Sequence, residues 1–270
     1  MTTVRTDPLE EGILRVTLER PERLNAISSG LLADLHATLD RLAVDRETRV
    51  VILTGAGRGF CSGADLGQRD GPGAIPGTEG MSPLGFVYRY QESLAEVMLK
   101  IHELPQPVIA AVNGVAVGGG LALALASDIR FASTEASFGS AFIKAGLSSC
   151  DVGTSYFLPR LIHPGDAAEL MLTGRIFDAE EARRLGLLQD LVAPEALQDR
   201  ALETARLIRN NNEYGVWMTK KGLWTNLDAP SLRHAMEIEN RTQVLGCFTG
   251  NMEEAMKAFV EKRPPNWKRL

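Results

Sequence analysis

Cysteine is scarce in this chain of 270 residues, which has only Cys61, Cys150 and Cys247. An odd number of widely spaced cysteines does not indicate a disulfide framework, and it is typical of a reducing, cytoplasmic compartment. The chain also has no CxxC pair and no cluster of cysteine and histidine. We therefore expect neither a zinc site nor another metal centre.

Long apolar runs and blocks of basic residues are missing as well. No stretch approaches the run of about 18 apolar residues that would span a membrane. Residues 1–11 are polar and acidic, without an apolar signal region or an Arg-rich transit pattern. The formal net charge is −5, and Lys and Arg do not cluster, so we expect no nucleic-acid partner. These absences predict a cytoplasmic protein without a membrane partner.

A glycine triplet is the most informative feature that the chain has. Residues 108–112 form an apolar run short enough for a buried strand, and Asn113-Gly114 then predicts a turn. Three glycines at 118–120 lead into residues 121–126, which are apolar on every side and therefore predict a buried helix. A helix start rich in glycine can hold a phosphate or an oxyanion. The alternative is that the glycines only allow the helix and strand to pack closely.

The preceding part of the chain predicts alternating strands and helices. Residues 12–18 alternate as a strand, leucines recur at helical spacing over residues 31–42, and residues 49–54 form a second apolar strand. A second loop of small residues follows at 59–66, and the Gly- and Pro-rich residues 67–83 predict a mobile surface loop. This order is α/β in character.

Strand patterns end near residue 195. Beyond it only helical patterns occur, among them residues 197–209. The sequence thus predicts a β-rich core over residues 1–195, which carries the site, and a helical region over residues 196–270.

Several of these segments together carry a family resemblance. In their order and spacing they resemble the crotonase (enoyl-CoA hydratase/isomerase) superfamily, from Gly12 to about Lys268. The segments are Arg20-Pro21 with Leu24-Asn25-Ala26, residues 60–66 (FCSGADL), residues 107–128, Phe138-Gly139, and residues 259–263 (FVEKR).

The resemblance implies a spiral of ββα turns with a helical C-terminal region that builds trimers, usually paired into hexamers. It also implies binding of an acyl-CoA thioester, with coenzyme A as part of the substrate and no separate cofactor. In the family, two backbone N–H groups meet the thioester oxygen, and by position these belong to Ala64 and Gly119. The two small-residue loops would then form one oxyanion hole.

The resemblance further implies a coenzyme A site on two segments of each chain. One side chain, Arg23, would meet a phosphate, or else it is a solvated loop charge. The C-terminal residues Phe259 and Lys262 would reach the coenzyme A of a neighbouring subunit, or else Lys262 is only an exposed helix-end lysine. The expected adenosine and pantetheine residues are Glu22, Arg23, Leu24, Ser62, Ala64 and Leu66.

The chain departs from the family where ordinary hydratases carry two glutamates. Ala122 occupies the first of these positions and Phe142 the second. Neither side chain can act as an acid or a base, so hydration by two glutamates is not expected.

One carboxylate, Asp151, lies close to the second position. Its surroundings are similar to the Asp-Val-Gly-Thr of dienoyl-CoA isomerases and the Asp-x-x-Thr-Ser-Tyr of 4-chlorobenzoyl-CoA dehalogenases, with a loop one residue different in length. The alternative is that Asp151 caps the next helix. Dehalogenation would need a histidine near Ala95, and His102 lies about two turns away, so it is not expected. Cys150 is expected to be a small buried residue, and Asp65 to fix its loop.

The predicted function is double-bond isomerisation of an acyl-CoA thioester, because one base suffices for that reaction. Asp151 would move the proton, and Ala64 and Gly119 would hold the enolate oxygen. One alternative is an enoyl-CoA hydratase that uses Asp151 and an ordered water. An alternative of another class is a non-catalytic protein that binds CoA esters.

Overall fold

The structure is a computed structural model that describes residues 2–67, 71 and 73–270. Part of the predicted loop 67–83 therefore lies outside the described residues. No helix in the described ranges is long and apolar enough to cross a membrane.

The larger sheet has six strands in the order β1-β2-β3-β5-β7-β10. β1 pairs antiparallel with β2, and the other pairs are parallel. All six residues of β3 and all five of β5 are buried, because both faces of the sheet are covered. The strands are β1 (Val4–Glu10), β2 (Ile13–Leu18), β3 (Val50–Gly55), β5 (Val108–Val112), β7 (Ile129–Ser133) and β10 (Asp190–Val192).

The smaller sheet repeats the order of the larger one. β3, β5 and β7 each continue after a short turn into β4, β6 and β8, and a helix follows β4 and β6. This confirms the predicted spiral of ββα turns. The strands of the smaller sheet are β4 (Gly59–Cys61), β6 (Val115–Val117), β8 (Ser137–Gly139) and β9 (Phe177–Asp178).

The helices cover both faces of the larger sheet. α3 is buried along its whole length, as its apolar sequence predicts, and it lies in the same core as α1 and α2. α7 packs on the opposite face of the sheet, where Ala201 and Ala205 form a second core cluster with the side chains of β3 and β5 that point to this face. The helices are α1 (Ser29–Val44), α2 (Pro83–Glu103), α3 (Gly119–Ala126), α4 (Thr154–Leu161), α5 (Pro164–Thr173), α6 (Ala179–Arg184), α7 (Leu197–Arg209), α8 (Glu213–Leu227), α9 (Leu232–Cys247) and α10 (Asn251–Glu261), with short 3-10 turns η1 (Pro21–Arg23), η2 (Ala141–Ala145) and η3 (Pro194–Ala196).

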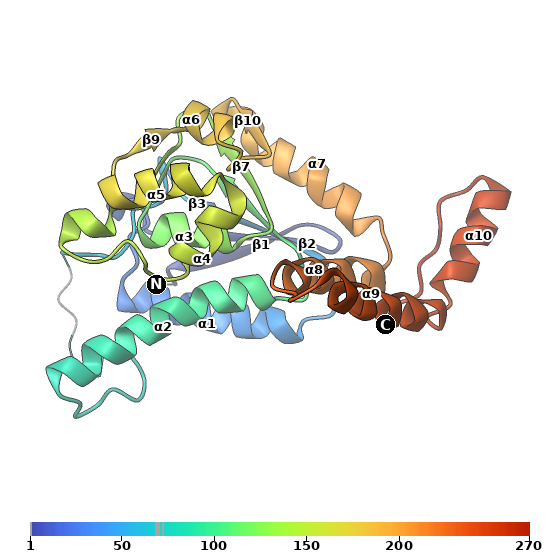
Figure 1. Cartoon of the computed structure of the whole chain (residues 1–270), viewed down its shortest axis with the longest axis horizontal. Coiled ribbons are helices and arrows are strands. Elements are labelled where there is room, and N and C mark those ends of the chain that lie inside the picture. Colours follow the sequence, from blue (N-terminus) through green and yellow to red (C-terminus); the bar gives the residue numbers. More distant parts are fainter. Residues whose placement is uncertain (1, 68–70, 72) are drawn as a thin grey trace.

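The helical region after residue 195 has two parts. α7 belongs to the core, whereas α8 and α9 lie beside it, and α10 stands apart from the body (Figure 1). The division of the chain at residue 195 stays a prediction. A boundary there would separate α7 from the sheet that α7 covers.

A buried ion pair joins α8 to the core. Lys220 Nζ lies 2.9 Å from Asp128 Oδ2, and the lysine side chain is only 5% exposed. Trp224 Nε1 donates to the other oxygen of Asp128 at 2.8 Å. Burial lowers the pKa of Lys220, and the Asp128 carboxylate opposes that change. The pair therefore holds α8 against the turn between α3 and β7.

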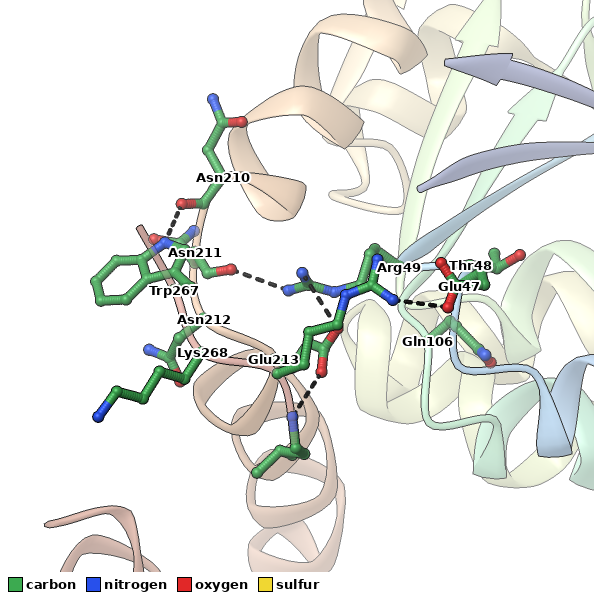
Figure 2. A network of polar contacts seen from close by, with 12 residues as sticks. Glu47, Thr48, Arg49, Gln106, Asn210, Asn211, Asn212, Glu213, Trp267 and Lys268 are labelled. Atoms are coloured by element: carbon green, nitrogen blue, oxygen red, sulfur yellow. Dashed lines mark hydrogen bonds and ion pairs between the residues drawn. The ribbon is translucent and has the colours of Figure 1, made fainter. Parts of the chain in front are cut away.

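The C-terminal segment returns from α10 to the start of α8, as Figure 2 shows. Trp267 Nε1 donates to the backbone oxygen of Asn210 at 2.7 Å. The N–H of Leu270 donates to Glu213, whose carboxylate also faces Arg49 at 3.6 Å. These contacts fasten the last residues to the end of α7 and the start of α8.

Candidate active site

The loop of small residues after β4 lies alongside the segment that precedes α1. The N–H of Ile27 donates to the Gly63 oxygen at 2.7 Å, and the N–H of Asp65 donates to the Ile27 oxygen at 2.9 Å. Ala64 lies between these two partners in a parallel bridge, so its own N–H and C=O face away from Ile27. Ala64 is also exposed. No residue that the structure describes accepts from its N–H, which can therefore meet a ligand on the side away from Ile27.

The glycine triplet forms the turn between β6 and α3. Gly118 has a φ of +56°, and its N–H donates to the Gly139 oxygen of β8 at 2.9 Å. The first bond of the helix runs from the N–H of Ala122 to the oxygen of Gly118. The N–H of Gly119, one residue into α3, has no partner within the helix and points out of its positive end.

The two loops touch through their backbones. A Cβ at Gly63 would lie 2.8 Å from the Val117 oxygen and 3.4 Å from the Gly119 nitrogen, and a Cβ at Gly120 would lie 1.8 Å from the Cys61 oxygen. Glycine is required at these positions because any side chain would push the loops apart. The two interpretations of the glycines, close packing and oxyanion binding, are therefore compatible. The same close approach puts Ala64 and Gly119 on facing loops. Two N–H donors arranged in this way can bind one negative oxygen.

The two positions at which hydratases carry glutamate are apolar in the structure too. Ala122 is fully buried in α3. Phe142 lies in η2, and its ring is 3.6 Å from where a Cβ on Gly118 would be. An aromatic ring therefore lies against the glycine turn, where it can exclude water but cannot move a proton.

Asp151 lies in the loop between η2 and α4 and is half-buried. Its Oδ1 accepts hydrogen bonds from the Val152 N–H, at 2.8 Å, and from Nε2 of Gln91 on α2. The alternative of a helix cap is wrong, because Gly153 is the N-cap of α4 and Thr154 N–H bonds to the backbone oxygen of Asp151. The contact from Gln91 was not predicted, since only the fold brings α2 to this loop.

Asp65 fixes its loop, as predicted. Arg20 donates to Asp65 Oδ2 at 2.9 Å, and the aspartate side chain is 7% exposed. The Arg20 hydrogen bond holds the pKa of Asp65 below its usual range. This carboxylate is thus held ionised by its partner and is part of the loop's framework.

The predicted coenzyme A residues lie in two places. Glu22 and Arg23 are exposed on η1, and Leu66 is exposed at the end of the facing loop. Between them, Ser62 N–H donates to the Leu24 oxygen at 3.0 Å, which joins the two segments into one surface.

The C-terminal candidates lie elsewhere. Phe259 and Lys262 are exposed at the end of α10, which stands apart from α3 and α4 (Figure 1). Within one chain the structure does not bring them to the two joined segments.

Two further residues that the sequence analysis considered are Cys150 and His102. Cys150 is exposed, so the expectation that it is buried was wrong. His102 packs between Phe157 and Trp224, at ring distances of 5.1 and 4.6 Å. No group of three potential metal ligands occurs among the residues that the structure describes.

Comparison with known proteins identifies the family. Residues 9–269 match the family described as enoyl-CoA hydratase/isomerase. A probable enoyl-CoA hydratase of Mycobacterium tuberculosis is 44% identical over 94% of this chain and 88% of its own length. The 1,2-epoxyphenylacetyl-CoA isomerase of Escherichia coli is 37% identical over 96% of both chains.

A crystal structure agrees with this. That of a probable enoyl-CoA hydratase/isomerase from Mycobacterium abscessus has a TM-score of 0.91 and 40% identity, and the match covers 98% of both chains. The fold and the sequence together show that this chain belongs to the enoyl-CoA hydratase/isomerase family of enzymes, within the crotonase superfamily.

Proposed function

We propose that the protein moves a double bond in an enoyl-CoA thioester, with Asp151 as the proton-transfer residue. The observation that carries the proposal is which side chains stand at the two glutamate positions and in the loop after them. Both glutamate positions are apolar, while Asp151 keeps a carboxylate in the next loop. Isomerisation needs one base, whereas the usual hydration needs two carboxylates.

The proposed reaction begins with a 3-enoyl-CoA. The Asp151 carboxylate removes a proton from C2, and the electron pair moves into a dienolate whose negative charge lies on the thioester oxygen. The N–H groups of Ala64 and Gly119 stabilise that oxygen, by about 3–4 kcal/mol for each donor. Asp151 then returns the proton to C4, and the double bond moves to C2–C3. No water is added, and the carboxylate is restored.

Substrate binding is proposed to use the surface that η1 and the loop after β4 form together. Leu24, Ser62 and Leu66 would line the pantetheine, and Arg23 would meet a phosphate, beside Glu22.

The coenzyme A of one chain is proposed to meet α10 of another, in a trimer or a pair of trimers. Supporting this, α9 and α10 carry large apolar side chains that are each more than half exposed, a composition typical of association surfaces. They include Val244, Leu245, Met256 and Phe259, and Phe248, directly after α9, is exposed as well. Phe259 and Lys262 would then complete a neighbour's site.

Water addition is the second candidate. It is favoured by the relative named a probable enoyl-CoA hydratase, and it would require Asp151 to activate an ordered water. The isomerase name of the Escherichia coli relative favours the first candidate. A protein that binds CoA esters without turnover is the alternative outside catalysis.

A panel of 2-enoyl, 3-enoyl and dienoyl CoA esters, followed by absorbance and mass, tests the proposal. Isomerisation changes the absorbance without changing the mass. Hydration of the 2-enoyl ester, with a product heavier by one water, would establish the second candidate instead. Binding of every ester without turnover would show a binding protein and refute both reactions.

A further inference from the structure

One helix, α2, touches both halves of the candidate site. The hydroxyl of Tyr90 is 3.5 Å from the Ile27 oxygen, and Ile27 is the residue paired with Ala64. The next residue, Gln91, donates through Nε2 to Asp151 Oδ1. Successive side chains on a helix diverge by about 100°, so neighbours can reach two different loops. α2 therefore links the loop of Ala64 to the loop of Asp151.

The two oxygens of Asp151 have different surroundings. Oδ1 accepts two hydrogen bonds, from Val152 N–H and from Gln91 Nε2. A carboxylate oxygen with two N–H donors has its lone pairs engaged, so it is a poor proton acceptor. Among the described residues, no side chain is seen to donate to Oδ2, which leaves that oxygen to take the proton.

The backbone around Asp151 is held in an unusual conformation. Val152 has a φ of +39°, which is rare for a β-branched residue. The N–H of Thr154 donates to the backbone carbonyl oxygen of Asp151 at 2.8 Å and closes the turn. These contacts fix the main chain, but the carboxylate can still rotate about its side-chain bonds. Gln91 is the side chain that fixes that rotation from outside the loop.

We propose that Gln91 is a positioning residue for proton transfer, which holds Oδ1 so that Oδ2 faces the substrate. The inference rests on the proposed role of Asp151. An amide suits this task because it donates a hydrogen bond without bringing a charge that would alter the base. It also identifies the α2 position that matters: Gln91 reaches the carboxylate, whereas Ala95, one turn later, packs on the core.

The test is Gln91→Met, which keeps the length of the side chain and removes the donor. Gln91 is exposed, so the fold should survive, and thermal unfolding checks this. We expect kcat to fall about 10- to 100-fold, since a misplacement of about 1 Å at a reacting group has that effect. The dissociation constant of the CoA ester should stay within twofold. Arg89→Met is the matched control and should keep full activity, because among the residues that the structure describes Arg89 pairs only with Glu92, along the helix.

A double-mutant cycle separates positioning from a general structural role. In an Asp151→Asn background, Gln91→Met should cause no further loss, because its effect passes through the carboxylate. An equal loss in both backgrounds, or unchanged kcat in the single variant, would overturn the inference. Asp151→Asn with wild-type activity would instead overturn the proposed function itself, so the two failures are distinguishable.

Discussion

Gly120→Ala tests how closely the two loops must approach. In the structure, a Cβ at Gly120 would lie 1.8 Å from the Cys61 oxygen and 2.6 Å from its carbon. Real Cβ atoms essentially never come within 3.0 Å of such an atom, so the start of α3 must move away from β4 by more than about 1 Å. The clash is with backbone, so no side-chain rotation relieves it.

That displacement would separate the N–H of Gly119 from the N–H of Ala64. Losing one oxyanion donor lowers turnover by about 10²- to 10³-fold, and we expect kcat/KM of Gly120→Ala to fall by that amount. The free energy of unfolding should fall by about 1–3 kcal/mol, the usual effect of overpacking. Steady-state kinetics on the best ester of the panel and urea unfolding measure the two effects.

Two other glycines serve as controls. At Gly119 a Cβ would lie 3.0 Å from the Cδ1 of Ile27, a methyl group that can move, and 3.8 Å from the Gly63 Cα, an ordinary contact, so Gly119→Ala should be milder. At Gly222, within α8, a Cβ would meet no described atom within 4 Å beyond the helix's own backbone, and Ala should stabilise the helix by about 1 kcal/mol. If Gly120→Ala kept kcat/KM within threefold of the wild type, the loop approach would not support catalysis and the reasoning would be wrong.

Three further predictions concern stability and reactivity. Lys220→Met should lower the free energy of unfolding by about 3–5 kcal/mol in urea titrations, because it leaves the Asp128 charge buried without its partner. Asp65 has a lowered pKa in the folded state, so its contribution is present above the unfolded pKa of about 4 and is lost as the pH falls through the folded value; Asp65→Asn should flatten the acid side of a stability–pH curve. Burial raises the pKa of Cys61 to about 12, so a thiol reagent at pH 8 should label the exposed Cys150 and Cys247 and leave Cys61 unmodified until the protein unfolds.

The sequence predicts long elements and capped ends well. The predicted helix over residues 197–209 has the same bounds in the structure. Ser28 and Ser29 precede the leucines at helical spacing and are both cap candidates in the sequence; the structure has Ser28 as the cap of α1, accepting from the Leu31 N–H at 3.2 Å. Amphipathic spacing and capping chemistry act within a few residues, so they can be read locally.

Short and polar strands could not be predicted, because their formation depends on pairing with distant segments. β1 has five polar or proline residues among its seven, and it is a strand because it pairs along β2. β4, β6 and β8 have three residues each, too few to show any period. Their pairing depends on where the spiral brings the chain.

Some residues of the candidate site could be predicted from the sequence, and others could not. The loops of Ala64 and Gly119 could be selected from sequence, because glycine and small residues mark a close approach of backbones. Gln91 could not, since it lies 60 positions before Asp151 and nothing near it in sequence indicates that contact.

Deuterium exchange tests the central claim most directly. A 3-enoyl-CoA ester is incubated in D₂O with the wild type and with Asp151→Asn, and deuterium at C2 and C4 is followed by mass and NMR while ester binding is measured separately. We expect exchange by the wild type and a rate at least about 100-fold lower in Asp151→Asn, with unchanged binding. Exchange at the wild-type rate in Asp151→Asn would contradict the account, because another group would then be moving the proton.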